Sequence, residues 1–283
     1  RNGVGLDYSG VQVESGNEAT AFEAYQAGII GFGEKFVKVP TVPAAPYAGR
    51  SVVLLGDSIT ETSNVDAGSY VYGTGYRANW PDHVIPEIQA SKVRTYARSG
   101  AHFADAAGLT TNQKMSTQVT NVRTQYTADS GIDLAILSFG TNDWGNSTTA
   151  GLGGAVVLGT AASALAKDYS DLNMTISCDA LVKNLHNLRY YCPATAILGL
   201  LPIQRGDSNP TAGMGAWIEE IRTIYKAFAV PIVDCFYGSG IVYRFETVSG
   251  AGLDLSDRLH PNAAGQAKQG RFILPYVQAA LTR

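Results

Sequence analysis

A serine, a histidine and an aspartate of this sequence have the types and the order that nucleophilic catalysis requires. Ser58 lies in Gly56-Asp57-Ser58-Ile59, directly after the apolar run of residues 52–55, and His260 lies far along the chain with Asp257 three residues before it. A serine hydroxyl is a weak nucleophile, and it becomes reactive beside a base that a third group orients. The three residues therefore predict a nucleophile, a base and an orienting carboxylate.

Two further positions offer hydrogen-bond donors for an oxyanion. Asn142 lies in Gly140-Thr141-Asn142-Asp143, directly after the most apolar run of the chain, and carries a side-chain amide. Gly100 follows Arg98-Ser99 and offers a main-chain N–H. A tetrahedral intermediate of acyl transfer is stabilised by such donors, so both residues are candidates for an oxyanion hole.

Each of these positions also has an interpretation without chemistry. Gly, Asp, Ser and Asn all favour turns, so the blocks are equally compatible with simple loops, and Asp257 with a solvated loop acid. Of the other histidines, His83 is predicted to lie in a polar turn and His186 in a helix, and neither has an expected role. His102 lies two residues after Gly100 and is a candidate for the same cleft.

The elements that must position these residues alternate along the chain. Apolar, β-branched runs predict strands at residues 51–55, 92–97, 134–139, 194–201 and 230–233. Between them, apolar residues recur with helical spacing and predict helices at residues 115–126, 181–188 and 217–228. This alternation predicts a parallel sheet covered by helices on both faces. Ser58, Gly100 and Asn142 each follow a run, at the strand ends where ligands bind in such sheets.

Residues 1–49 differ from the rest of the chain. They are rich in glycine, and the proline-rich stretch 38–46 is incompatible with a regular helix or a central strand. We interpret them as an N-terminal arm or small module with a linker and a short helix at 19–28, without a predicted function. Residues 50–283 form the predicted catalytic domain.

Composition excludes several classes of function. The net charge of −3 and the absence of a basic cluster argue against nucleic acid as a partner, and no apolar run is long enough for a membrane span. The three cysteines form no disulfide framework and have no metal-ligand spacing. We expect neither a metal nor a cofactor. The glycine-rich start without Met is compatible with a module of a larger surface or phage-tail protein. The sequence does not decide the compartment, and we expect an extracellular or virion-surface location before a cytoplasmic one.

Taken together, the four blocks resemble those of the SGNH hydrolases, also called the GDSL esterase/lipase family, over residues 50–283. Ser58, Gly100, Asn142 and His260 stand where that family has the residues of its name. The resemblance implies a three-layer α/β/α sandwich with a five-stranded parallel sheet, similar to flavodoxin. It also implies a serine esterase that uses no metal.

The same resemblance implies a role for each residue. Ser58 attacks the acyl carbon, His260 moves the proton to the leaving alcohol, and Asp257 holds His260 in its tautomer. The main-chain N–H groups of Ser58 and Gly100, with the Asn142 amide, form the oxyanion hole.

The substrate is predicted from residues near these blocks. Tyr76 and Trp80 lie in an aromatic, glycine-rich stretch after Ser58, Trp144 follows the third block, and Arg205 follows the fourth strand; with His102 they are candidates to bind a sugar. Ordinary packing of the aromatics, or a surface ion pair for Arg205, are the alternatives. These residues favour an acylated carbohydrate as the substrate.

Residues 145–166 form a long insertion after the third block, and long loops are often lids. An apolar lid would favour a lipase or thioesterase acting on long acyl chains. The insertion has few large apolar residues, however, so short acyl groups, acetyl first, are expected. A glycan-binding module without catalysis is the remaining alternative.

Overall fold

The computed structural model describes residues 31–32, 35–36, 47–63, 65–66, 69–72, 79–147, 155–207, 213–247 and 252–282. Tyr76 and the predicted helix at 19–28 lie outside these residues. The chain divides into two compact units, Arg1–Ala48 and Gly49–Arg283. In the first, the described strands β1 (Gly31–Phe32) and β2 (Lys35–Phe36) pair antiparallel as a small hairpin.

A seven-stranded sheet forms the centre of the second unit, in the order β4-β5-β6-β3-β7-β8-β9. Its parallel part consists of β3 (Ser51–Gly56), β6 (Lys92–Thr95), β7 (Leu134–Ser138), β8 (Ala196–Leu200) and β9 (Ile232–Val233). These are the five predicted strands, and their order is that of a flavodoxin-like sheet. Two short antiparallel strands, β4 (Val65–Asp66) and β5 (Ser69–Tyr70), extend the edge at β6.

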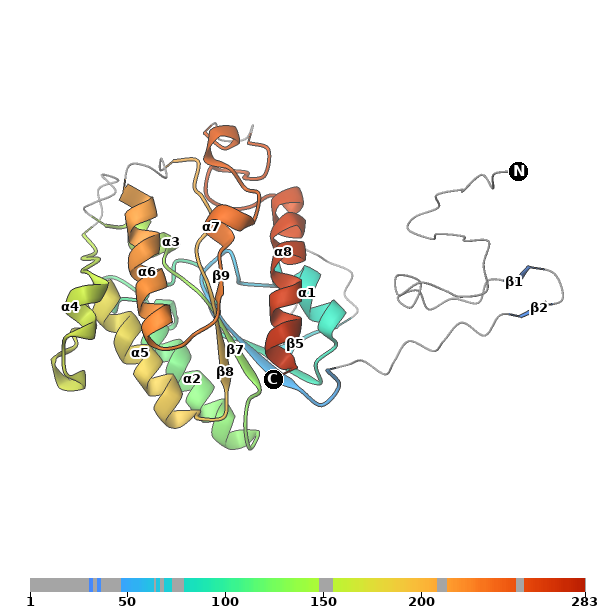
Figure 1. Cartoon of the computed structure of the whole chain (residues 1–283), viewed down its shortest axis with the longest axis horizontal. Coiled ribbons are helices and arrows are strands. Elements are labelled where there is room, and N and C mark those ends of the chain that lie inside the picture. Colours follow the sequence, from blue (N-terminus) through green and yellow to red (C-terminus); the bar gives the residue numbers. More distant parts are fainter. Residues whose placement is uncertain are drawn as a thin grey trace. The chain divides into compact units, whose positions relative to one another are not determined.

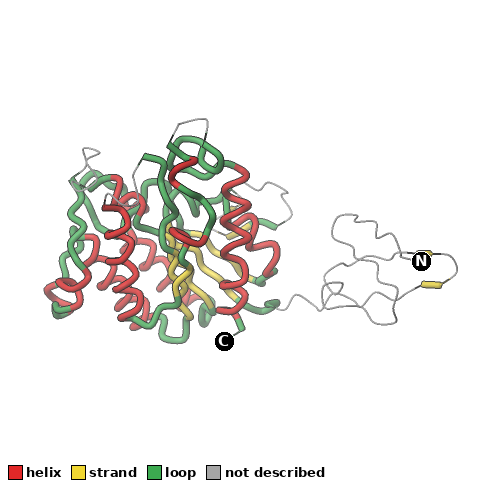
Figure 2. Tube along the Cα trace, turned by 45° about the horizontal axis from the view of Figure 1, so that its top comes forward, coloured by secondary structure: helices red, strands yellow, loops and turns green. Residues whose placement is uncertain are grey.

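Helices cover both faces of this sheet, as the alternating pattern predicts (Figure 1). On one side lie α2 (Met115–Ala128), α5 (Ser177–Tyr191) and α6 (Gly215–Ala227), with the short α4 (Ala161–Leu165) packed on α5 and α6. On the other side α8 (Ala263–Leu281) packs against α1 (Pro81–Ile88) and α7 (Cys235–Gly238). Figure 2 shows the strands enclosed between these helices.

The strands are buried on both faces because they carry continuous apolar runs. Val53 and Leu55 of β3 belong to the core cluster beneath α2, α5 and α6, whereas Val52 and Leu54 alternate to the opposite face and are equally buried. The central strand therefore has no polar face, in agreement with a parallel sheet inside three layers.

Two local predictions differ from the structure. The predicted polar turn at His83 is the helix α1, which begins with Pro81 at its start and Asp82 in its first turn, both of which favour a helix N-terminus. Part of the insertion 145–166 is the helix α4, whose N-cap Thr160 accepts a hydrogen bond from Ser163 N. Among the described residues, no helix is long and apolar enough to cross a bilayer.

Candidate active site

The turn after β3 presents Ser58 at the carboxyl end of the central strand. The carbonyl of Asp57 accepts hydrogen bonds from Thr60 N (3.1 Å) and Glu61 N (2.8 Å), which close the turn. Gly56 is required before it, because a Cβ there would lie 2.7 Å from Ser138 O. The buried Gln118 side chain bonds both the N–H (2.9 Å) and the carbonyl (3.0 Å) of Gly56, which holds the strand end in place.

Ser58, His260 and Asp257 form a continuous hydrogen-bonded chain. Ser58 Oγ lies 2.8 Å from His260 Nε2, and His260 Nδ1 lies 2.7 Å from an oxygen of Asp257. An ionised carboxylate only accepts hydrogen bonds, so Nδ1 carries the proton and Nε2 is left with its lone pair toward the serine hydroxyl. This is the tautomer that a general base for Ser58 requires.

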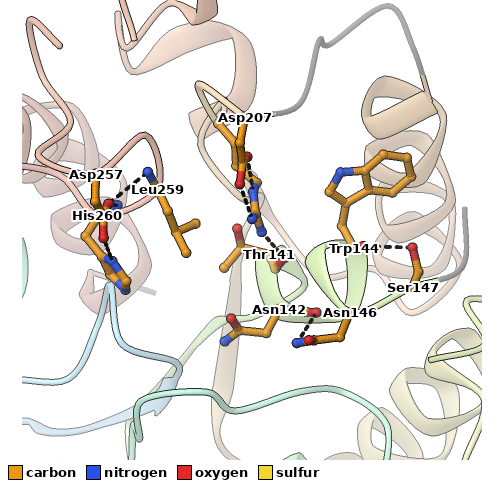
Figure 3. A network of polar contacts seen from close by, with 10 residues as sticks. Thr141, Asn142, Trp144, Asn146, Ser147, Asp207, Asp257, Leu259 and His260 are labelled. Atoms are coloured by element: carbon orange, nitrogen blue, oxygen red, sulfur yellow. Dashed lines mark hydrogen bonds and ion pairs between the residues drawn. The ribbon is translucent and has the colours of Figure 1, made fainter. Parts of the chain in front are cut away.

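The loop before α8 fixes Asp257 as the partner of His260. Oδ1 of Asp257 accepts from the main-chain N–H of Leu259 (3.0 Å) and of His260 (2.6 Å), while Oδ2 faces the ring (Figure 3). Arg258 adopts the left-handed conformation, with φ of 68°, so the chain turns back within three residues. Partial burial raises the pKa of Asp257, but the hydrogen bonds from His260 and Leu259 outweigh it and hold the pKa below its ordinary value.

The second and third blocks follow the strands on either side of β3. Gly100 follows β6 and Asn142 follows β7, and both strands pair with β3. Asn142 Nδ2 donates to Ala101 O at 3.0 Å, which ties the two blocks to each other. Within the described residues, no protein group accepts a hydrogen bond from the main-chain N–H of Ser58 or Gly100. Both N–H groups are therefore available to a ligand at this edge of the sheet.

Two buried carboxylates beneath the site were not singled out from the sequence. Asp143 receives hydrogen bonds from Phe103 N (2.9 Å) and Ser177 Oγ (2.6 Å) and so holds the second block to the third. Asp57 bonds Ile59 N at 3.0 Å. Burial raises the pKa of Asp57 to about 7, against the hydrogen bond from Ile59, with a further rise from the negative charge of Asp143. In the sequence, the only indication of their importance is that Asp57 directly precedes Ser58 and Asp143 directly follows Asn142.

Two of the predicted substrate-binding residues, Trp80 and Trp144, are buried. Trp80 is 0% exposed and donates to Thr60 Oγ1, and Trp144 is 2% exposed in the core. Because neither ring reaches solvent, we assign both to packing rather than to substrate contact. Tyr76 lies outside the described residues.

Arg205 is 5% exposed, so it is neither a surface ion pair nor an open anion site. Its guanidinium binds Asp207 through two nitrogens (2.8 and 2.7 Å) and donates to Thr141 O (2.8 Å). Since Thr141 precedes Asn142, these contacts tie Arg205 to the third block.

His102 is also buried. Asn146 Nδ2 bonds its Nε2 at 2.9 Å, and its Nδ1 has no hydrogen-bond partner in the described structure. The same Asn146 amide donates to Asn142 O, so His102 contacts the third block through Asn146.

Other places in the described part of the chain offer less for this chemistry. A cavity of about 490 Å³ opens between Arg50, Lys92 and Asp133. These residues lie at the amino ends of the strands, at the edge opposite Ser58. No cluster of three or more His, Cys, Asp or Glu side chains in the described ranges is arranged to hold a metal ion.

Comparison with known proteins identifies the family. Among solved structures, a protein from Lactobacillus plantarum is 19% identical and shares the fold, with a TM-score of 0.56 over 82% of this chain and 98% of that chain. An acetyl xylan esterase from Geobacillus stearothermophilus is 15% identical, with a TM-score of 0.49 over 83% of this chain and 95% of that chain. No curated protein matches.

Residues 54–268 match the GDSL-like Lipase/Acylhydrolase family, in agreement with the resemblance found in the sequence. With this match spanning well over half of its 283 residues, the chain belongs to the GDSL-like lipase/acylhydrolase family.

Proposed function

We propose that this member of an ester-hydrolysing family cleaves short acyl esters of a carbohydrate, acetyl esters first, with Ser58 as nucleophile. The observation that carries the chemistry is the pair of contacts at 2.8 Å (Ser58 to His260) and 2.7 Å (His260 to Asp257). They join a hydroxyl, a base with its lone pair directed at that hydroxyl, and a carboxylate that fixes the base.

The reaction proceeds in two halves. Ser58 Oγ attacks the acyl carbon while its proton passes to His260 Nε2, and the tetrahedral intermediate collapses as His260 returns this proton to the leaving alcohol oxygen. Water then attacks the acyl-serine, giving its proton to His260, and the acid leaves as Ser58 recovers its hydrogen. Asp257 remains ionised throughout and stabilises the imidazolium, consistent with its lowered pKa.

The oxyanion of each intermediate is proposed to bind the N–H groups of Ser58 and Gly100 and the side-chain amide of Asn142. The two N–H groups have no protein acceptor within the described structure, and Asn142 keeps one amide hydrogen beyond the one that Ala101 O accepts. Donors held in place before the reaction stabilise the developing charge without reorganisation.

The preference for a short acyl group rests on the insertion after the third block. In its described part, α4 packs on α5 and α6, and Ala161 and Ala164 are buried by that contact. The helix is built mainly from small residues, and the exposed large apolar side chains of residues 155–166 are Val157 and Leu165. Two separate side chains form a smaller apolar surface than a long acyl chain needs, which favours a short acyl group.

A longer acyl chain is the second candidate, because two exposed apolar side chains lie on the segment that leads to the proposed base. Phe245 and Leu253 are each 61% exposed and are joined by the hydrogen bond from Leu253 N to Phe245 O (3.2 Å). Exposed apolar groups close to each other are common at ligand-binding surfaces. If they line the acyl site, the substrate is a lipid or thioester.

Hydrolysis of p-nitrophenyl acetate, butyrate and octanoate, with Ser58→Ala as the control, tests both candidates. Activity that is highest on acetate and absent in Ser58→Ala supports the short-acyl esterase and justifies a screen of acetylated polysaccharides. Highest activity on octanoate, reduced by Phe245→Ser, supports the second candidate. Absence of Ser58-dependent hydrolysis on all three esters and on acetylated polysaccharides contradicts the proposal and favours a glycan-binding module.

A further inference from the structure

The loop that carries Gly100 is a tight turn with one peptide unit that is free to rotate unless it is held. Ala101 N donates to Arg98 O at 3.0 Å, which closes a four-residue turn, and Gly100 has φ of 75°, the value of the third residue in a type II turn. Type I and type II turns differ in the orientation of their central peptide. Here that peptide joins Ser99 to Gly100.

The orientation of this peptide decides where the proposed oxyanion donor points. A peptide unit is planar and trans, so the Ser99 carbonyl and the Gly100 N–H point in opposite directions. If the unit turned over, the N–H would leave the oxyanion site and the carbonyl oxygen would replace it. An electronegative oxygen facing a developing oxyanion would oppose the reaction, so the turn must be locked in one state.

Gln113 holds the carbonyl side of this peptide. Its Nε2 donates to Ser99 O at 2.9 Å. The amide is itself oriented, because its Oε1 accepts from Thr110 N (2.9 Å) and Thr110 Oγ1 (3.0 Å) in a capping box at the short helix Thr111–Gln113. A Cβ at position 100 would lie 2.6 Å from Nε2, so only glycine admits this contact.

Glu61 holds the preceding peptide from the other side. Its Oε2 accepts from Ser99 N at 2.7 Å, and its Oε1 pairs with Arg98 at 3.0 Å. The main-chain N–H of Glu61 donates to Asp57 O in the nucleophile turn. One residue therefore joins the turn that carries Ser58 to the turn that carries Gly100.

We propose that Gln113 is a positioning residue for the oxyanion hole, which locks the Ser99–Gly100 peptide so that the Gly100 N–H faces the reacting carbonyl, with Glu61 holding the same turn. This inference rests on the proposed esterase function. The side chains of Gln113 and Glu61 bond the main chain of Ser99, so the proposed effect of both passes through the Gly100 N–H.

Gln113→Glu tests the inference. The substitution keeps the size of the side chain and the acceptor for Thr110, but places an oxygen against Ser99 O, so the contact becomes repulsive and favours the turned-over peptide. Loss of an oxyanion donor costs on the order of 10²–10³ in kcat, and partial loss of its orientation is expected to cost about 10- to 100-fold. KM should change little, because the donor acts on the intermediate and not on the bound ester.

A second readout separates positioning from a general structural effect. A boronic acid that adds to the Ser58 hydroxyl forms a tetrahedral adduct resembling the intermediate, and its affinity should fall by a factor similar to that in kcat. Gln89→Glu makes the same chemical change at an exposed residue that ends α1, and should alter neither value. If Gln113→Glu shows a lowered melting temperature, Gln113→Met removes the donor without adding a charge and is measured instead.

The outcomes are distinct. An active wild-type enzyme whose Gln113 variants keep kcat and boronic acid affinity, or raise KM alone, overturns the positioning role and leaves the esterase intact. A wild-type protein without Ser58-dependent hydrolysis on any ester tested overturns the proposed function and this inference with it. A parallel fall of kcat and boronic acid affinity at unchanged KM supports the inference.

Discussion

Replacing Asp257 by asparagine should damage the enzyme more than replacing it by alanine. In the structure, Oδ1 of Asp257 accepts two main-chain hydrogen bonds, from Leu259 and His260, while Oδ2 faces His260 Nδ1. An asparagine at this position keeps its oxygen on the two N–H groups and directs its amide nitrogen at the ring. That nitrogen only donates, so Nδ1 must accept and the proton moves to Nε2, where it faces Ser58.

The structure also sets the size of this effect. Turning the asparagine amide over would lose two main-chain hydrogen bonds, each worth about 0.5–1.5 kcal/mol, so about 1–3 kcal/mol holds the amide nitrogen toward His260. At about 1.4 kcal/mol for each factor of ten, this bias toward the unproductive tautomer is on the order of 10- to 100-fold. Alanine removes the support of the ring but imposes no tautomer. We therefore expect kcat to fall by a factor of about 10³–10⁴ in Asp257→Asn, as for other triads. In Asp257→Ala the fall should be about tenfold smaller.

Steady-state hydrolysis of p-nitrophenyl acetate by the two variants, with melting temperatures to verify folding, measures the difference. An equal fall of kcat in the two variants would mean that the two main-chain hydrogen bonds do not hold the asparagine amide in one orientation. A lower kcat in Asp257→Ala than in Asp257→Asn would refute the tautomer argument. Wild-type rates in both would remove Asp257 from the mechanism.

Two further predictions concern other parts of the site. Asn142→Ala should lower kcat on the order of 10²–10³ with little change in KM, because one oxyanion donor is lost; turnover like that of the wild type, measured on the same ester, would exclude Asn142 from the oxyanion hole. Asp57→Asn should alter the pH dependence of stability. Because burial raises the folded-state pKa of Asp57 to about 7 from an ordinary 3.8, its proton stabilises the fold at low pH, and this contribution is lost as pH rises through about 7. The melting temperature of Asp57→Asn relative to the wild type should therefore increase from pH 4 to pH 8, and a difference independent of pH would contradict it.

The strands and most helices could be predicted because each is a local pattern. Residues 134–139 and 194–201 are mainly apolar over the length of a strand, which is typical of a strand buried on both faces. The stripes on α2, α5 and α6 repeat with the helical period. The helix α1 was missed because eight residues with two prolines resemble a turn, and its buried face becomes visible only against α8.

The aromatic residues show where sequence reasoning fails. Tryptophans near a predicted active site are equally suited to packing and to sugar binding, and neighbours decide which applies. Trp80 packs at the start of α1 beside Thr60, and Trp144, a residue of the short helix α3 (Thr141–Gly145), packs into the core, so both are buried. For a residue in or next to a short helix, its position in the sequence does not predict whether its side chain faces the solvent or the core.

By itself, the sequence determined the family, the parallel sheet and the residue types of the site, because these depend on local motifs and on the order of strands. Only the tertiary structure decided how the surroundings act on these residues. It forms the hydrogen bond between Ser58 and His260, which are 202 positions apart, and the hydrogen bond from Gln113 to Ser99 O. It also buries Asp57 and so raises the pKa of its carboxyl group. These contacts join segments that are distant in sequence. Their distances and solvent exposure arise only when the sheet and its covering helices are assembled.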